Sequence, residues 1–186
     1  VNDIAPEFTS EATFTADENQ TAIGSVIASD AEGDGITFTV SGTELAITSA
    51  GVLTFVSAPD YETKSSFTAT VTASDGVNET TQAITIELVN LNDNNPVFTS
   101  DTTLSAAENQ KAIGSVTATD ADGDAVSFSV SGSELEITTS GILTFKAAPD
   151  YETKSSYTAT VTMTDSVNSL TQDITVNVTD ANDAPI

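Results

Sequence analysis

Carboxylates are the side chains of this sequence that could do chemistry, and they recur in small groups. The chain has 28 Asp and Glu residues against four Lys, with no His and no Cys, and a formal net charge of −24. Catalysis that depends on His or Cys is therefore excluded. Paired carboxylates could cleave glycosidic bonds, but this requires a carboxylic acid whose pKa is raised by apolar surroundings. Nothing in the sequence indicates such a residue. We expect that the chain is not an enzyme.

The same acidity restricts the partners of the chain. Nucleic acid binding is not expected, because neutralising phosphates requires Lys and Arg. Direct membrane insertion is not expected either, because no apolar run approaches the ~18 residues of a membrane span. No signal peptide is recognisable at the start of the sequence.

The acidic groups fall at the ends of predicted strands, in two sets that recur 90 residues later. The first set is Glu18, Asp60, Glu62, Asn92 and Asp93, and its second copy is Glu108, Asp150, Glu152, Asn182 and Asp183. The other set is Asp30, Glu32, Asp34 and Asp75, and its second copy is Asp120, Asp122, Asp124 and Asp165. Ca²⁺ takes six to eight oxygen ligands of these kinds. The alternatives are a solvated acidic surface and turns capped by Asp and Asn.

The whole sequence repeats with the same period. When residues 2–91 are placed on 92–181, 54 of the 90 positions are identical. An Asn-Asp pair opens each period at residues 2, 92 and 182. We therefore expect two domains, residues 1–91 and 92–186, with further repeats on both sides.

Within each repeat, apolar and polar residues alternate with a period of two. Examples are residues 67–73, 84–88, 157–163 and 174–178, with shorter ones at 38–40 and 53–55. Such alternation is typical of half-buried strands, and Gly, Asp and Pro turns separate the runs. About seven short strands per repeat predict an all-β fold of two tandem Greek-key β-sandwich domains, cadherin-like or immunoglobulin-like.

The ordered motifs resemble those of cadherin repeats, in particular bacterial cadherin-like repeats of large surface or secreted adhesins. Residues 91–98, Leu-Asn-Asp-Asn-Asn-Pro-Val-Phe, resemble the inter-repeat linker. Asp120-Ala-Asp122 and the Pro-Asp-Tyr-Glu runs at 59–62 and 149–152 resemble two further calcium motifs. The resemblance covers essentially the whole chain, twice.

The resemblance implies Ca²⁺ ions between consecutive repeats. The complete site would use Glu18, Asp60, Glu62, Leu91, Asn92, Asp93, Asn94, Asp120, Asp122 and Asp165, with Leu91 and Asn94 contributing carbonyl oxygens. Half-sites would consist of Asn2, Asp3, Asp30, Glu32 and Asp75 at one end, and of Glu108, Asp150, Glu152, Asn182 and Asp183 at the other. Two departures from the pattern are notable. Glu32 stands where the motif has Asp, so the upstream site is expected to differ, and the loop after Asp122 is short, so Asp124 or a nearby carbonyl would replace a ligand.

The function implied is a calcium-dependent cell-surface or extracellular adhesion or stalk module, in which Ca²⁺ rigidifies the linker. Neighbouring repeats, a homophilic protein partner or an extracellular polysaccharide are the partners considered. The alternative is a calcium-stabilised carbohydrate-binding module of a secreted protein. Such a module usually offers exposed aromatic residues, and this chain has no Trp and three Tyr.

Overall fold

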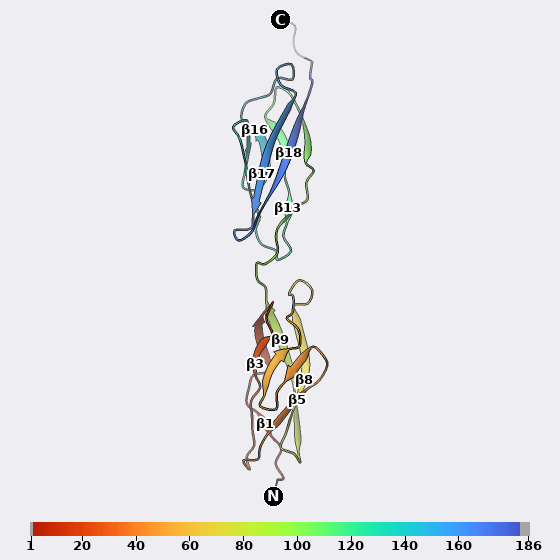
Figure 1. The fold of residues 1–186 in the computed structure, drawn as a ribbon, viewed down its shortest axis with the longest axis vertical. Helices are drawn as coiled ribbons and strands as arrows, with labels where there is room; N and C mark the ends of the chain where they lie inside the picture. Colours follow the sequence, from red (N-terminus) through yellow and green to blue (C-terminus); the bar gives the residue numbers. More distant parts are fainter. Residues whose placement is uncertain (1, 183–186) are drawn as a thin grey trace. The chain divides into compact units, whose positions relative to one another are not determined.

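The computed structural model describes residues 2–182 and divides the chain into two compact units, Val1–Leu91 and Asn92–Ile186, called repeat 1 and repeat 2 below. The regular structure of the described residues consists of strands (Figure 1). Within residues 2–182, no helix has the length and apolar character that crossing a membrane requires.

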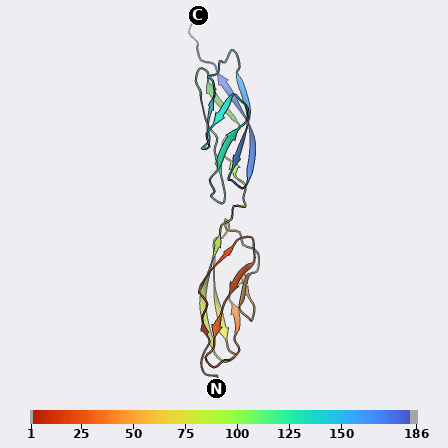
Figure 2. The same cartoon turned by 90° about the vertical axis from the view of Figure 1, so that its left-hand side faces the viewer.

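Repeat 1 contains nine strands arranged in three sheets. They are β1 (Glu7–Phe8), β2 (Thr13–Asp17), β3 (Ala22–Ser25), β4 (Ala28–Ser29), β5 (Thr37–Val40), β6 (Leu45–Ile47), β7 (Val52–Phe55), β8 (Ser66–Ser74) and β9 (Glu79–Val89). One sheet has the order β2-β9-β8-β5, a second has β3-β7-β6, and β1 pairs with β4. The two larger sheets form the layers of a sandwich (Figures 1 and 2).

Repeat 2 reproduces this arrangement strand by strand. Its strands are β10 (Val97–Phe98), β11 (Thr103–Ala107), β12 (Ala112–Ser115), β13 (Ala118–Thr119), β14 (Ser127–Val130), β15 (Leu135–Ile137), β16 (Ile142–Phe145), β17 (Ser156–Thr164) and β18 (Ser169–Thr179). The sheets are β11-β18-β17-β14, β12-β16-β15 and β10-β13. The all-β, two-sandwich prediction is confirmed. The alternating runs named in the sequence lie in β5, β7, β8, β9, β17 and β18, whereas the other strands were not predicted individually.

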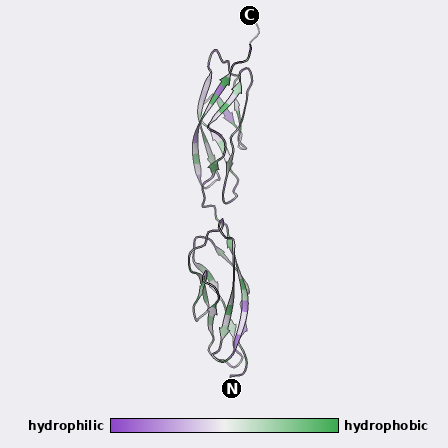
Figure 3. Ribbon diagram, turned by 90° about the vertical axis from the view of Figure 1, so that its right-hand side faces the viewer, coloured by the Kyte–Doolittle hydropathy of each residue, from purple (hydrophilic) through white to green (hydrophobic). Residues whose placement is uncertain are grey.

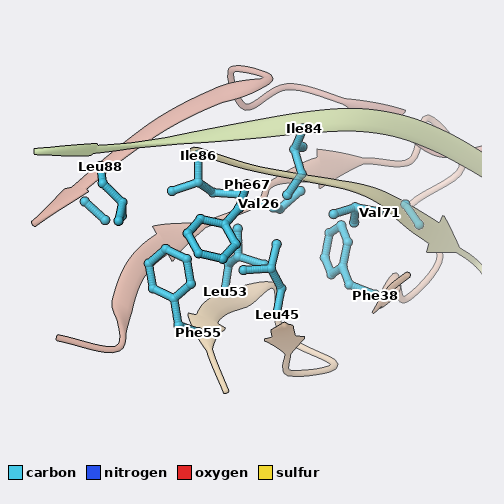
Figure 4. Packing of buried hydrophobic residues seen from close by; sticks show 12 residues of the cluster. Val26, Phe38, Leu45, Leu53, Phe55, Phe67, Val71, Ile84, Ile86 and Leu88 are labelled. Carbon is cyan, nitrogen blue, oxygen red and sulfur yellow. The ribbon is translucent and has the colours of Figure 1, made fainter. Parts of the chain in front are cut away.

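The core of each repeat consists of the inward-facing residues of these alternating strands. In the β8–β9 hairpin of repeat 1, Phe67 faces Ile86 across the ladder, and both are buried. Leu53 and Phe55 of β7 approach them from the other sheet (Figure 4). Hydrophobic and hydrophilic colours accordingly mix within single strands (Figure 3). Burying one face of each strand fixes its register, because a slip of one residue would expose the whole apolar set.

One pairing in each repeat joins segments that lie far apart in the sequence. β2 runs parallel to β9, with Thr13 opposite Thr85, and β11 runs parallel to β18 in the same way. The parallel direction places the end of β2 beside the end of β9. The turn that follows β2 therefore lies next to the segment that leaves the repeat at Leu91.

A glycine fixes the β6–β7 turn and its copy in repeat 2. Gly51 and Gly141 have positive φ angles of 85° and 91°. A Cβ at Gly51 would collide with the carbonyl oxygen of Val26, and one at Gly141 would collide with that of Val116. The backbone itself occupies the space of a side chain at these two positions, so only glycine fits.

Candidate metal centre

Each repeat brings acidic residues together at both of its ends. At the end where β9 or β18 finishes, the Glu18 cluster consists of Glu18, Asp60 and Glu62, and the Glu108 cluster consists of Glu108, Asp150 and Glu152. At the other end, the Asp30 cluster consists of Asp30, Glu32 and Asp34, and the Asp120 cluster consists of Asp120, Asp122 and Asp124. Within each cluster, one carboxylate oxygen per residue lies within 4.8 Å of the others. The 11-residue β9 separates the two ends by roughly 35 Å.

Glu18 anchors its cluster from inside the fold. Its side chain is almost completely buried, with 2% of its surface exposed. Its Oε2 accepts the Tyr61 N–H at 2.7 Å and its Oε1 accepts the Leu91 N–H at 2.8 Å. Glu108 repeats the arrangement with the N–H groups of Tyr151 and Ala181, both at 2.8 Å. These buried carboxylates tie three chain segments together at one end of each repeat.

Asp60 adds a carboxylate that its own loop keeps ionised. Its Oδ2 accepts the Thr63 hydroxyl at 2.8 Å, and its Oδ1 accepts the Glu62 N–H at 3.0 Å. The Thr63 hydroxyl is the main reason that the pKa of Asp60 lies below its usual value. In repeat 2 the Thr153 hydroxyl lowers the pKa of Asp150 in the same way. Both groups are therefore anionic over a wide pH range, as metal ligands must be.

Asp30 and Asp120 each satisfy one oxygen and leave the other buried without a hydrogen bond. Asp120 Oδ1 accepts the N–H groups of Asp122 at 3.0 Å and Asp124 at 3.2 Å. Asp30 Oδ1 does the same within its loop, whereas neither Oδ2 has a hydrogen-bond partner. A buried carboxylate oxygen without a partner is costly in free energy. A hard cation would satisfy it, so these residues fit a bound Ca²⁺.

Glu32 takes the same structural role in repeat 1 that Asp122 takes in repeat 2. Glu32 Oε2 accepts the N–H groups of Asp3 at 2.8 Å and Ile4 at 3.0 Å. Asp122 Oδ2 accepts those of Asp93 at 3.1 Å and Asn94 at 2.9 Å. Both side chains therefore hold the Asp of the Asn-Asp pair and the residue that follows it. The longer side chain of Glu32 reaches the same partners, so the exchange of Asp for Glu preserves this contact.

Asp75 and Asp165 do not join the acidic clusters but order the β8–β9 and β17–β18 turns. Asp165 Oδ1 accepts the N–H groups of Val167 at 2.8 Å and Asn168 at 2.6 Å. Burial opposes its ionisation, but these hydrogen bonds outweigh burial, and the pKa of Asp165 lies below its usual value. For Asp75, the hydrogen bond from the Asn78 N–H is the main cause of a lowered pKa.

Two site residues, Asn78 and Asn168, were missed by the sequence analysis. Asn168 Nδ2 donates to Asn92 Oδ1 at 3.0 Å, to Asn94 O at 3.1 Å and to Asp165 Oδ2 at 3.1 Å. Asn78 Nδ2 likewise donates to Asn2 Oδ1 at 2.9 Å. The recurring Asp-x-x-Asn spacing of the two turns was the signal that could have found them. They connect the linker Asn to the aspartate of the turn.

Asp93, Asn182 and Asp183 complete the set of predicted ligands. Asp93 Oδ1 accepts the Asn94 side-chain amide at 2.9 Å. Asn182 follows β18 within the described residues, and Asp183 lies outside them.

Lys64 and Lys154 pair with Glu44 and Glu134, each at 2.6 Å. Two of the four lysines therefore hold carboxylates outside the clusters.

Comparison with known sequences finds two kinds of similar protein. The Bacterial Ig domain family matches residues 2–87. Protocadherin Fat 4 of Mus musculus is 34% identical over 140 residues, which is 66% of this chain and 3% of that protein. Protocadherin Fat 4 of Homo sapiens is 34% identical over 127 residues, 61% of this chain and 2% of that protein. The chain thus spans a small fraction of the curated relatives that it matches.

Solved structures similar to this chain are tandem cadherin repeats. Mouse cadherin-23 EC22-24 has a TM-score of 0.82 and 24% identity, and the match covers 97% of this chain and 68% of that one. Human protocadherin-24 EC1-2 has a TM-score of 0.80 and 22% identity, with coverage of 96% and 99%. These similarities show that the chain has the fold of two tandem cadherin-like β-sandwich repeats.

Proposed function

We propose that this chain is part of a calcium-dependent adhesion or stalk module on the outside of a bacterial cell, in which Ca²⁺ rigidifies the linker between repeats. One observation carries the proposal. Both repeats build the same acidic cluster at each end, and Asp30 and Asp120 each keep a buried carboxylate oxygen without a hydrogen bond. A buried oxygen of this kind is costly in free energy, and a bound cation would offset that cost.

The ions at the junction would take their ligands from both repeats and from the linker. Repeat 1 would contribute Glu18, Asp60 and Glu62, the linker would contribute Leu91 O, Asn92, Asp93 and Asn94 O, and repeat 2 would contribute Asp120, Asp122 and Asp165. Bound Ca²⁺ would supply positive charge to these carboxylates. Without it, a net charge of −24 opposes any compact arrangement.

The covalent connection of the repeats supports a shared site. The Leu91 N–H is held by Glu18 in repeat 1, whereas Asn92 Oδ1 accepts from Asn168 in repeat 2. These two anchored residues are consecutive, and the next N–H, that of Asp93, is held by Asp122. Cations that bind carboxylates on both sides of this short connection would favour one arrangement of the repeats.

The remaining clusters would be completed by neighbouring repeats. Asn2, Asp3, Asp30, Glu32 and Asp75 form the candidate half-site at one end, and Glu108, Asp150, Glu152, Asn182 and Asp183 form the candidate half-site at the other. The module is proposed to be non-enzymatic. A homophilic protein partner or an extracellular polysaccharide would bind the parent protein. The similarity of the two repeats favours a spacer role for this part of it.

Isothermal titration calorimetry tests whether the chain binds Ca²⁺ in preference to Mg²⁺. The ligand set suits a large, flexible coordination shell rather than a strict octahedron, so we expect Ca²⁺ to bind more tightly than Mg²⁺. The expected dissociation constant lies on the order of 10⁻⁶ to 10⁻³ M. Equal heats and affinities for the two ions would contradict a dedicated calcium site.

Small-angle scattering of the 186-residue chain tests the rigid linker. In Ca²⁺, Asp93→Ala should give the broad size distribution that the unmodified chain gives in chelator, while both sandwiches stay folded. Asp3→Ala is the matched control, since it changes the equivalent position at the start of repeat 1. If Asp93→Ala remains as rigid as the unmodified chain, or Asp3→Ala loosens the pair equally, calcium does not rigidify this linker.

A further inference from the structure

The turn between β2 and β3 of repeat 1 contains a motif that the calcium site does not explain. Residues 17–21 read Asp-Glu-Asn-Gln-Thr. The Asn-x-Thr sequence within them is an acceptor for N-glycosylation, which requires a surface loop in an exported protein. Such tripeptides also arise by chance in a Thr-rich chain, so the structure around this one decides its meaning.

Hydrogen bonds to the rest of repeat 1 fix this turn, and most of its residues are exposed to solvent. Glu18 is buried and fixed by two N–H groups, and the Asn19 N–H donates to Pro59 O at 2.9 Å. The other residues of the turn, Asp17, Asn19, Gln20 and Thr21, are exposed. The acceptor Asn and the Thr two residues later therefore both lie on the surface. A modification at Asn19 would leave the core intact.

Two other Asn-x-Thr sequences lie in different environments. Asn177-Val178-Thr179 forms the end of strand β18, where Val178 is buried, and Asn78-Glu79-Thr80 lies where β9 begins. Asn78 is half-buried, and its Nδ2 donates to Asn2 Oδ1 at 2.9 Å and to Asp75 Oδ2 at 3.2 Å. Attaching a sugar to this nitrogen would replace one of its hydrogens and disrupt these contacts. In the folded protein, Asn78 is therefore not expected to be glycosylated.

Repeat 2 provides a natural comparison for Asn19. Its equivalent turn, residues 107–111, reads Ala-Glu-Asn-Gln-Lys, and Asn109 has the same positive φ of 61° as Asn19. Asn is favoured at such a φ, so the conserved backbone shape explains the Asn in both repeats. It does not explain Thr21, which is replaced by Lys111, or Asp17, which is replaced by Ala107. Of these two turns, the one in repeat 1 alone has the complete Asn-x-Thr sequence.

We propose that Asn19 is an N-glycosylation site. This inference rests on the extracellular location in the proposed function, since the donor sugar is presented outside the cytoplasm. The donor would be a polyprenyl-diphosphate-linked oligosaccharide, and an oligosaccharyltransferase would catalyse the transfer. The proposed site includes Asp17, the acidic residue two positions before the acceptor, which repeat 2 replaces with Ala107. Asn78 has Gly76 at that position.

The transfer is balanced without an oxidant or a reductant. Asn19 Nδ2 forms a bond to the anomeric carbon of the first sugar as the bond from that carbon to the phosphate oxygen breaks. The polyprenyl diphosphate leaves with the electron pair of the broken bond. One proton passes from Nδ2 to a basic group of the enzyme.

A reciprocal exchange between the two turns tests the site. The folded 186-residue chain would be incubated with a single-subunit oligosaccharyltransferase and its lipid-linked oligosaccharide, and then analysed by intact mass and peptide mapping. We expect the mass of one oligosaccharide to be added at Asn19. Thr21→Lys and Asp17→Ala, which each copy repeat 2, should abolish or greatly reduce the addition. The double change Ala107→Asp with Lys111→Thr should add a second oligosaccharide, at Asn109.

Thr21→Lys is a suitable control variant because repeat 2 folds with Lys at this position. The Thr21 and Lys111 carbonyls both accept a backbone N–H at 2.8 Å. A free peptide of residues 15–23 serves as the positive control for the enzyme. Modification of the peptide but not of the folded chain would overturn the proposal, as would failure of both or modification at Asn78 instead of Asn19.

Calcium calorimetry on the same proteins separates this proposal from the proposed function. Thr21→Lys should bind Ca²⁺ as the unmodified chain does. Failure of the unmodified chain to bind Ca²⁺ would count against the metal site and would leave the glycosylation result unchanged.

Discussion

At the scale of single residues, the fold uses the buried side chains of two glutamates as structural anchors, and both oxygens of each take part. Glu18 and Glu108 are nearly inaccessible, yet each accepts two backbone N–H groups, one on each oxygen. A carboxylate can accept with both oxygens, whereas the amide of Gln has one acceptor oxygen and a donor NH₂. The anchor is therefore specific for Glu even in the absence of metal.

Glu18→Gln should destabilise repeat 1 by about 1–3 kcal/mol in chelator, because one buried N–H group loses its acceptor and faces a donor. Urea unfolding would measure the loss. Glu11→Gln, at an exposed position, is the matched control and should be nearly neutral. Equal stability of the two variants would show that Glu18 does not anchor the turn.

The lowered pKa of Asp60 predicts that one contribution to the stability of repeat 1 is lost in acid. The pKa of Asp60 lies below the usual 3.8 in the folded state, chiefly because of the Thr63 hydroxyl. A depressed folded-state pKa stabilises the protein above the unfolded-state pKa, and this stabilisation is lost as the pH falls through the folded-state value. In chelator, an NMR titration should place the midpoint of Asp60 below 3.8.

Thr63→Val should raise the midpoint of Asp60 and leave that of Asp150 in place, since Asp150 keeps its own hydrogen bond from Thr153. The second repeat thus serves as an internal reference in the same sample. An unchanged Asp60 midpoint in Thr63→Val would contradict the assigned cause.

At the scale of the strands and turns, much of the fold could be predicted and much of the site geometry could not. Alternation over 67–73 and 84–88 predicted β8 and β9, because burying one face of a strand leaves a period of two in the sequence. The roles of Thr63 and Asn78 depend on hydrogen bonds that no period records. The burial of Glu18 likewise depends on the parallel pairing of β2 with β9, which brings together segments about 70 positions apart. Sequence patterns report local geometry more directly than such long-range contacts.

The β15–β16 turn offers a test of how the backbone limits the sequence. Gly141→Ala should destabilise repeat 2 by more than Gly132→Ala. Both residues have positive φ, 91° and 86°, but only the Cβ at 141 would collide with the Val116 carbonyl oxygen. Strain at such a φ costs on the order of 1–3 kcal/mol, and the collision adds to it at 141. Thermal unfolding of the two variants measures the difference, and a larger loss at 132 would contradict this account.

At the scale of the whole molecule, stability should depend on both the metal and the ionic strength. A ligand at 100 times its dissociation constant adds about 2.7 kcal/mol to the stability of the state that binds it. Chelation should therefore lower the melting temperature. Salt should restore part of the loss, because it screens repulsion among the carboxylates. Identical melting curves in Ca²⁺ and in chelator would show that the acidic clusters only solvate the surface.

The parallel β2–β9 pairing has a consequence for how neighbouring copies avoid exchanging strands. β2 must find a partner about 70 residues away, and a chain with a 90-residue period offers β18 as a competing partner for it. The inward side chain differs between the copies: Phe14 packs beside Gly24, and Leu104 packs beside Gly114. A swapped β11 would leave a void where Phe14 belongs, and a swapped β2 would overfill the site of Leu104. Two otherwise similar repeats thus carry different side-chain volumes at this contact, which opposes domain swapping during folding.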